Sequence, residues 1–542
     1  IPLLTTDEVY LVRFVPNRIS YRASLNAFST VNENGLDDFF DEFELKPAKN
    51  VEIDEKVFES FDWYDKQIGS NKEQKLAIKN IINCTAFPFP YVVFGPPGTG
   101  KTSLIVEAVA QILKHKPKSR ILITAQSNSA CDEIGIRLQK HVSSFKIFRY
   151  YSSSLLDKKN DKTNRKLRST SNLRNDKNQR PSMEELFHFK VVITTLLTSS
   201  RLIQLEVSGL NRHFDYIFVD ECAAATEPEV LVPIAGFGTA DKEITTNIVL
   251  LGDHKQLGPI ISSDFAASLG LRFSLMERIM TKRFYSQDLQ KSFNSKYVTQ
   301  LLDNFRSHQA ILQFSNDMFY DSKLRAKAAD SVKSWAYNWS FLPNKTFPLL
   351  FHCVKTPSSI EKGGTSSFNH GEIKQVRFYV DSLLKFGVNG QSVDQKDIGI
   401  VSPYKAQHNL LKKKLNNFRD IEIGSAEYYQ GREKKIIIIS TVKSFSGVGF
   451  LKSEKRLNVC ITRAKSLLIV IGNAQTLQQS SLWRNFLHYL KMNNACCGKP
   501  FTLKQPSTVG IATFDTAEND SDAEIEALND RMERLKMLSL RI

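Results

Sequence analysis

The stretch PYVVFGPPGTGKTS, residues 90–103, constrains the fold of this chain more than any other segment. Its apolar run Tyr91 to Phe94 predicts a buried strand, and Ile105 and Val109 recur at helical spacing after the glycines. Between strand and helix, GPPGTGKT fits the pattern G-x-x-x-x-G-K-[ST], in which backbone N–H groups at a helix N-terminus surround phosphate oxygens. The segment therefore predicts a nucleoside triphosphate site.

Five polar side chains in and beyond this loop suit phosphate chemistry. Lys101 can reach the β- and γ-phosphates, and Thr102 can hold Mg²⁺. Asp220 and Glu221 end the strand YIFVDE, where ligands of open α/β sheets bind, so we expect Asp220 to hold Mg²⁺ and Glu221 to orient water. Gln256, in GDHKQLGP after another strand, is an uncharged group able to sense a γ-phosphate or an attacking water.

Apolar strands alternate with helical patterns from Gly69 onward, which is typical of a parallel α/β sheet. The first series reads YVVF, RILITA, KVVITT, YIFVDE and NIVLLGD, and a second, from Phe347, reads PLLFHCV, DIGIVSP, KKIIIIST and SLLIVIG. We therefore expect two α/β domains in tandem. Only the first has a glycine-rich loop, so the nucleotide should lie between one complete and one degenerate site. Arg306 and Arg463 are candidates to bring positive charge to it, or else surface residues.

The composition favours a polyanionic partner, because the formal net charge is +16 and the pI is near 9.3. The polar, basic stretch from Tyr150 to Pro181 reads as a surface insertion, either a phosphate-contacting arm or a solvated loop. Seven cysteines without C-x-x-C spacing predict reduced thiols without zinc. No apolar run approaches a membrane span of about 18 residues. Because the chain starts at Ile1, we expect a fragment or a processed form.

Nine sequence blocks follow one another in a recognisable order. They are NKEQ, GPPGTGKT, AQSNSACDE, VDECAAATEPE, GDHKQLGP, NFRSH, SPYKAQ, SAEYYQGREKKIIIIS and RLNVCITRAK. Over residues 71–473 the set resembles the superfamily 1B helicases of the up-frameshift group. The flanks PYVVFGPPGTGKT, LLDNFRSH and VRFVPNR look most like the Armitage and Mov-ten branch of RNA-silencing helicases.

The resemblance implies a role for each matched residue. Gln74 would read the adenine, Phe305 would stack on it, and Glu433 would lie near the nucleotide sugar or the interdomain cleft. Arg306 and Arg463 would be arginine fingers. The phosphate loop would consist of Gly95, Pro96, Pro97, Gly98, Thr99, Gly100, Lys101 and Thr102. The RNA backbone would be gripped by Ser127, Asn128, Thr194, Thr195, Pro403 and Tyr404.

The resemblance also implies that both α/β domains are RecA-like. The expected division is the end of a β-barrel at 1–16, a stalk helix and linker at 17–68, a first domain at 69–285 with a basic insertion at about 150–188, a second domain at 286–480, and a tail at 481–542. In the stalk, Tyr21, Leu25 and Phe28 share one helix face. The tail carries a helical stripe from Ile525 to Leu538, which packs on its own protein or binds a partner.

Four positions depart from the family pattern without removing a catalytic group. Gln126 and Gln309 replace prolines, Phe305 replaces a tyrosine, and Glu427 stands where aspartate is usual. Phe305 keeps its stacking face, so activity is still expected.

The sequence thus predicts an ATP- and Mg²⁺-dependent helicase or translocase on single-stranded RNA. The resemblance implies 5′ to 3′ movement, a role in piRNA-type silencing with ribonucleoprotein partners, a cytoplasmic location that includes granules, and a monomeric catalytic unit. Two alternatives stay open. One is a DNA or mixed RNA/DNA helicase, and the other is an ATP-gated RNA clamp with little unwinding.

Overall fold

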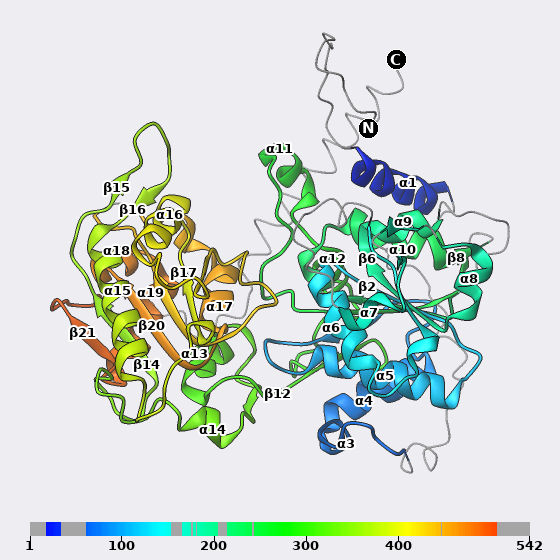
Figure 1. Ribbon diagram of the computed structural model, residues 1–542, viewed down its shortest axis with the longest axis horizontal. Helices are drawn as coiled ribbons and strands as arrows, with labels where there is room; N and C mark the ends of the chain where they lie inside the picture. Colours follow the sequence, from blue (N-terminus) through cyan, green and yellow to red (C-terminus); the bar gives the residue numbers. More distant parts are fainter. Residues whose placement is uncertain are drawn as a thin grey trace, which may run out of the picture.

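The computed structural model describes residues 18–33, 61–152, 165–174, 177–179, 181–203, 214–240, 243–445 and 447–506. The predicted β-barrel end at 1–16, the middle of the basic insertion and the C-terminal helical stripe lie outside the described residues. Two α/β bodies lie side by side, the first coloured blue to green and the second green through yellow to orange (Figure 1). No helix in the described ranges is both long and apolar enough to cross a lipid bilayer.

The first domain is built on a seven-stranded sheet in the order β11-β1-β10-β7-β2-β6-β3, with every neighbouring pair parallel. Its strands are β1 (Tyr91–Phe94), β2 (Ile121–Ala125), β3 (Ile147–Arg149), β6 (Val191–Thr195), β7 (Tyr216–Asp220), β10 (Asn247–Gly252) and β11 (Val298–Gln300). Its main helices are α4 (Lys72–Asn83), α5 (Lys101–His115), α6 (Asn128–Leu138), α9 (Leu196–Ile203) and α10 (Glu227–Phe237). The strands are near-continuous apolar runs because helices cover both faces of a parallel sheet.

The second domain repeats this plan with six strands in the order β18-β17-β19-β20-β14-β21, again parallel throughout. Its strands are β14 (Leu349–Cys353), β17 (Ile398–Val401), β18 (Glu422–Gly424), β19 (Lys434–Ser440), β20 (Ala464–Gly472) and β21 (Cys496–Gly498). Its main helices are α13 (Gln309–Phe319), α15 (His370–Phe386), α16 (Lys405–Lys414), α17 (Glu454–Ile461) and α19 (Ser481–Met492). The predicted fold class, two parallel α/β domains in tandem, is confirmed.

Short elements connect these parts. They include α3 (Lys66–Ser70), α7 (Arg165–Arg168), α8 (Met183–His188), α11 (Asp264–Ala266), α12 (Leu275–Ile279), α14 (Asp330–Lys333), α18 (Ala474–Leu477) and the strand pairs β4–β5 (Leu173–Arg174, Lys177–Asn178), β8–β9 (Thr239–Ala240, Glu243–Ile244), β12–β13 (Asp303–Asn304, Arg325–Ala326) and β15–β16 (Ser359–Ile360, Ser367–Phe368). The pair β12–β13 lies in the connection between the two sheets.

The sheets of the structure extend across both predicted borders of the second domain. The first domain does not end at Tyr285, because β11 pairs with β1 and completes the first sheet. The second domain does not end at Ser480, because β21 pairs with β14 and α19 buries Trp483 and Phe486 in the second core. The sequence missed both strands because three-residue runs such as VTQ and CCG carry no recognisable apolar period.

The predicted stalk helix is α1 (Ile19–Glu33), which packs on α10 and α9 of the first domain. Its small residues Ala27 and Val31 face that surface and are buried. Tyr21, Leu25 and Phe28 do share a face, but this face is exposed.

Ile437→Ala should lower the free energy of unfolding of the second domain by about 2–5 kcal/mol, because it removes buried methyl groups and leaves a cavity. Ile437 is fully buried in β19, opposite Gly399 of β17 and Leu468 of β20. The matched control is Ile260→Ala, at a side chain that is 70% exposed. This control should change the free energy by about 0.5 kcal/mol or less. Urea denaturation followed by tryptophan fluorescence makes the measurement, and equal losses in both variants would contradict this core assignment.

Candidate functional site

The predicted phosphate loop connects β1 to α5, and two of its glycines adopt the left-handed backbone conformation. Gly98 and Gly100 have φ of +71° and +86°, a region that side chains disfavour. A Cβ atom at Gly98 would also lie 2.5 Å from Cβ of Arg306. Gly100 caps α5, so the first N–H groups of that helix face the loop. Such a helix start binds anions, as the sequence predicted.

Lys101 is folded back over this loop. Its Nζ donates a hydrogen bond to the Gly95 carbonyl at 2.6 Å. Thr99 Oγ1 donates to the Pro96 carbonyl at 2.8 Å, which fixes the other side of the loop. The loop is therefore held in shape by its own side chains, and the ammonium of Lys101 already lies beside the glycines.

Two buried carboxylates end neighbouring strands next to the loop. Asp220 ends β7 and is 3% exposed, and Glu221 follows it in the left-handed region with φ of 53°. Burial raises the pKa of Asp220 well above its usual range, the charge of Glu221 raises it further, and Lys101 opposes both effects. Asp253 follows β10 and is also 3% exposed; burial raises its pKa as well, while Lys101 again lowers it. The ionised forms of Asp220 and Asp253 are therefore less stable in this site than in water. A bound cation would stabilise them.

The sequence did not lead us to predict Asp253 as a site residue. Its Oδ2 accepts hydrogen bonds from Gln256 Nε2 at 2.6 Å and from the Tyr320 hydroxyl at 2.8 Å. Asp253 therefore sets the orientation of Gln256. Its position, directly after an apolar strand, is the one signal in the sequence that could have revealed it.

The two domains meet at Gln256 and Arg463. Arg463 Nη2 donates to Gln256 Oε1 at 2.7 Å, and its Nε donates to the Val459 carbonyl. The side chain is 2% exposed, and burial, followed by the charge of Arg306, lowers its pKa to about 10. Beside it, Asn458 Nδ2 reaches the Lys255 carbonyl at 3.0 Å. A buried guanidinium from the second domain is therefore aimed at the strand ends of the first.

Arg306 follows the connecting strand β12 and lies against the phosphate loop, with Glu433 as its partner. Its Nε forms an ion pair with Glu433, whose other oxygen lies 2.6 Å from Lys465 Nζ. Burial alone would raise the pKa of Glu433, but the charges of Arg306 and Lys465 lower it to about 2. The structure thus places Glu433 at the interdomain cleft and in contact with one of the two predicted fingers.

Gln74 lies on α4, close to the phosphate loop, and its side-chain oxygen is available to accept a hydrogen bond. Its Nε2 donates to the Thr99 carbonyl at 3.1 Å, while Oε1 is buried and has no hydrogen-bond partner among the described residues. A buried acceptor without a donor is unfavourable, and the exocyclic amine of adenine supplies one. Phe305 lies nearby, half-buried, with its N–H donating to the Gly98 carbonyl at 2.9 Å. These residues fit an adenine nucleotide.

Two side-chain oxygens that could hold a metal lie at this edge of the first sheet. Thr102 is in the first turn of α5, and Asp220 ends β7. Mg²⁺ often takes only one or two protein ligands when phosphates and water complete its shell, so this pair fits Mg²⁺ held together with a nucleotide.

The predicted RNA contacts of the first domain are only partly accessible. Ser127 caps α6 and is exposed, whereas Asn128 Oδ1 accepts from Arg149 Nη2 at 2.8 Å. Thr194 is fully buried, and its hydroxyl donates to the Tyr150 carbonyl. The Thr194 side chain therefore faces the protein interior, because a hydroxyl after an apolar run can face either side of the strand end, and its contact with RNA stays a prediction. Thr195 is half-buried and bonds Thr198.

The second domain offers Pro403 and Tyr404 at the start of α16. Pro403 is half-buried, while Tyr404 is 6% exposed and burial raises its pKa to about 12. Lys443 lies 5.2 Å from the centre of the Tyr404 ring. Pro403 and Tyr404 therefore follow β17 in the second domain, where the Tyr404 ring has little contact with solvent.

Known proteins resemble this chain over most of its length. Two family models described as AAA domains match, one over residues 69–177 and 149–264 and the other over 271–475. The chain is 38% identical over 519 residues to mov-10-B.1 of Danio rerio, covering 91% of this chain and 50% of that protein. It is 35% identical to the RNA helicase Mov10l1 of Homo sapiens (89% and 39% covered) and 27% identical to armi of Drosophila melanogaster (95% and 47%). The chain belongs to the Mov-10 and Armitage family. It spans about half the length of the curated relatives that it matches.

Asp220→Asn should change how the stability of this Mov-10 family chain depends on pH. The raised pKa means that folded Asp220 keeps a proton that the unfolded chain releases near pH 4. The contribution of Asp220 to the free energy of unfolding is therefore intact below about pH 4, and it declines as the pH rises toward the raised pKa. We expect Asp220→Asn to gain stability over the wild type between about pH 5 and pH 7.5 in urea unfolding. If the free energies of unfolding of Asp220→Asn and the wild type differed by the same amount at about pH 5 and at about pH 7.5, the raised pKa would be contradicted.

Proposed function

We propose that this chain is an ATP-driven helicase or translocase acting on single-stranded RNA. The contact between Arg463 and Gln256 carries this proposal, because it joins a buried cation of the second domain to the strand ends that surround the phosphate loop. Chemistry at the loop and the relative position of the two domains are then linked. A protein that only bound nucleotide would not need this link.

The residues of the chain divide the work between the two domains. Bound ATP would supply the free energy, with Mg²⁺ balancing the charge of its phosphates. Lys101 and the loop N–H groups would hold the phosphates, Thr102 and Asp220 would hold the ion, and Glu221 would orient water. Arg463 and Arg306 would provide positive charge where negative charge develops. Gln256, fixed by Asp253, would connect that charge to the domain interface.

Movement along RNA would follow from domain closure and reopening. Ser127 and Thr195 of the first domain and Pro403 and Tyr404 of the second would hold the strand alternately. Contacts to the backbone imply little sequence preference and strong salt dependence. The family resemblance supports 5′ to 3′ movement.

The cellular setting is also part of the proposal. We infer a role in small-RNA silencing of the piRNA type, in the cytoplasm and its ribonucleoprotein granules, with protein partners and a monomeric catalytic unit. This inference rests on the family alone. Localisation of the tagged chain and recovery of small RNAs after crosslinking would test it.

Glu221→Gln should bind ATP and RNA but hydrolyse ATP at a background rate, because the group that orients water is neutral. Wild-type hydrolysis should rise strongly with single-stranded RNA and less with a single-stranded DNA of matched sequence. Steady-state phosphate release measures both effects. Retained turnover in Glu221→Gln would contradict the role of Glu221. Equal stimulation by DNA would favour a mixed-substrate helicase, and stimulated hydrolysis without strand separation would favour an ATP-gated clamp.

Arg463→Ala should slow ATP turnover by on the order of 10³-fold while leaving ATP affinity nearly unchanged, as for other phosphoryl-transfer fingers. Arg463→Lys should restore little, because an ammonium cannot reproduce the planar guanidinium. Arg419→Ala, at an exposed arginine of the same domain, is the matched control and should hydrolyse ATP normally. Normal turnover in Arg463→Ala would overturn the shared site.

A further inference from the structure

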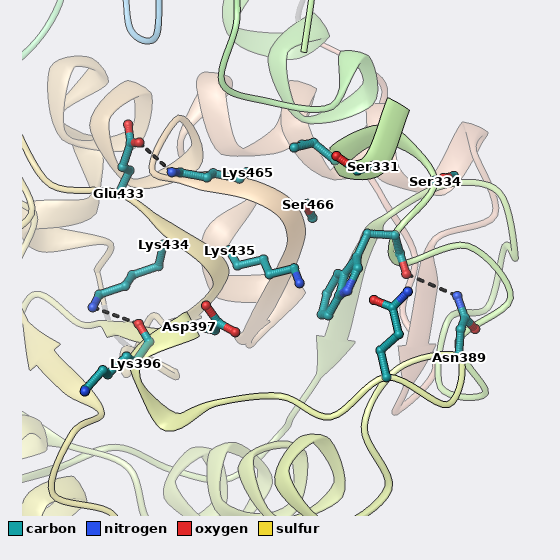
Figure 2. Close-up of a pocket in the computed structure, with 13 residues that line it drawn as sticks. Ser331, Ser334, Asn389, Lys396, Asp397, Glu433, Lys434, Lys435, Lys465 and Ser466 are labelled. Atoms are coloured by element: carbon teal, nitrogen blue, oxygen red, sulfur yellow. Dashed lines mark hydrogen bonds and ion pairs between the residues drawn. The ribbon is translucent and has the colours of Figure 1, made fainter. Parts of the chain in front are cut away.

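The second domain contains a cavity of about 550 Å³ beside the predicted nucleotide site. It is bordered by α14 and the segment after it, the loop before β17, and the first residues of β19 and β20. Of the predicted site residues, Glu433 alone lines it. Figure 2 shows Lys434, Lys435 and Lys465 together, with Ser331 and Ser334 across the space. The volume lies in the range of small-molecule sites.

The charge of the lining is positive. Four lysines, Lys396, Lys434, Lys435 and Lys465, line the cavity with two carboxylates, Asp397 and Glu433. Glu433 is already paired with Arg306 and Lys465, and Lys434 is paired with Glu422 at 2.9 Å, outside the lining. Lys435 has no carboxylate within ion-pair distance in the described ranges. Its Nζ lies 4.0 Å from the centre of the Trp335 ring. This ammonium is therefore available to an anion.

Two further donors in the lining are buried without partners. Trp335 is 6% exposed and Ser466 is 1% exposed. Neither Trp335 Nε1 nor Ser466 Oγ has a hydrogen-bond partner among the residues that the structure describes. Leaving such groups without hydrogen bonds is unfavourable. An indole N–H can only donate, so it requires an acceptor.

We propose that this cavity binds a small phosphate-bearing anion. Phosphate oxygens accept hydrogen bonds from N–H and O–H donors and pair with ammonium groups. Three residues that line the cavity, Trp335, Ser466 and Lys435, carry one donor of each kind. The same chemistry is presented by inorganic phosphate, a polyphosphate or a nucleoside monophosphate.

The position of Lys465 connects this anion to the nucleotide site, a consequence that rests on the proposed function. Lys465 lines the cavity and also holds Glu433, the partner of Arg306 (Figure 2). An anion that attracts Lys465 weakens its hold on Glu433. Glu433 then pairs more strongly with Arg306 and keeps this finger from the phosphates. The bound anion therefore slows ATP hydrolysis.

Calorimetric titration tests the site itself. The background is Lys101→Ala, which removes the ammonium of the phosphate loop, and the probes are inorganic phosphate, tripolyphosphate and AMP. We expect at least one probe to bind, and to bind at least about tenfold more weakly after Lys435→Gln, since a charged hydrogen bond is lost. Trp335→Phe, which keeps the ring and loses the N–H, should also weaken binding. Lys413→Gln, at an exposed lysine of α16, should not.

The outcomes of this titration are distinct. Binding that falls equally in Lys435→Gln and Lys413→Gln, or stays unchanged in both Lys435→Gln and Trp335→Phe, would show unspecific attraction to a basic protein and overturn the site. Absence of binding by all three probes would also overturn it. These results do not depend on ATP turnover, so they are separate from any failure of the proposed function.

Hydrolysis assays test the connection to Arg306. At constant free Mg²⁺, the binding probe should lower the maximal rate of RNA-stimulated hydrolysis by the wild type, with inhibition that saturating ATP does not relieve. Lys435→Gln should hydrolyse ATP normally and resist this inhibition. Inhibition that ATP fully relieves, or that persists in Lys435→Gln, would place the probe in the phosphate loop and overturn the connection.

Discussion

The hydrogen bond between Arg463 and Gln256 is the interaction on which the rest of the site depends. It is buried, and it joins the two domains directly where their strand ends face each other. A guanidinium removed from water is tolerated only with several acceptors, and Gln256 and the Val459 carbonyl supply two of them. Gln256 is in turn fixed by Asp253, which also holds Tyr320, and Tyr320 accepts from Asn458. A continuous set of hydrogen bonds thus crosses the interface between the domains and restricts the orientation of these side chains.

Glu433 forms a second set of polar contacts at the interface between the domains. It balances the charges of Arg306 and Lys465, and its strongly lowered pKa shows how firmly the carboxylate stays ionised there. Arg306 therefore has a competing partner on the second domain while it lies against the glycine loop of the first. The balance between these two positions is set by local charge, which is why a cavity beside Lys465 can influence it.

The sequence predicted the parts of the fold that rest on local pattern. The strand, glycine loop and helix around Lys101 have an unmistakable order, and the long apolar runs of both sheets predict buried parallel strands. The short edge strands β11 and β21 could not be predicted, because pairing with β1 and β14 defines them rather than their own residues. Asp253 and the burial of Thr194 depend on which way a side chain points at a strand end, and a single sequence does not reveal that.

The membership of β11 in the first sheet has a consequence for dissecting the molecule. Arg306 lies only a few residues beyond Gln300, the last residue of that strand, so this arginine is tethered to the sheet that carries the phosphate loop. A fragment cut at the apparent border near Tyr285 would leave β1 as an unprotected edge and invite aggregation. A fragment cut after Arg306 would keep one arginine and lose the other. Neither domain alone therefore holds the complete shared site, so both have to be expressed in one chain.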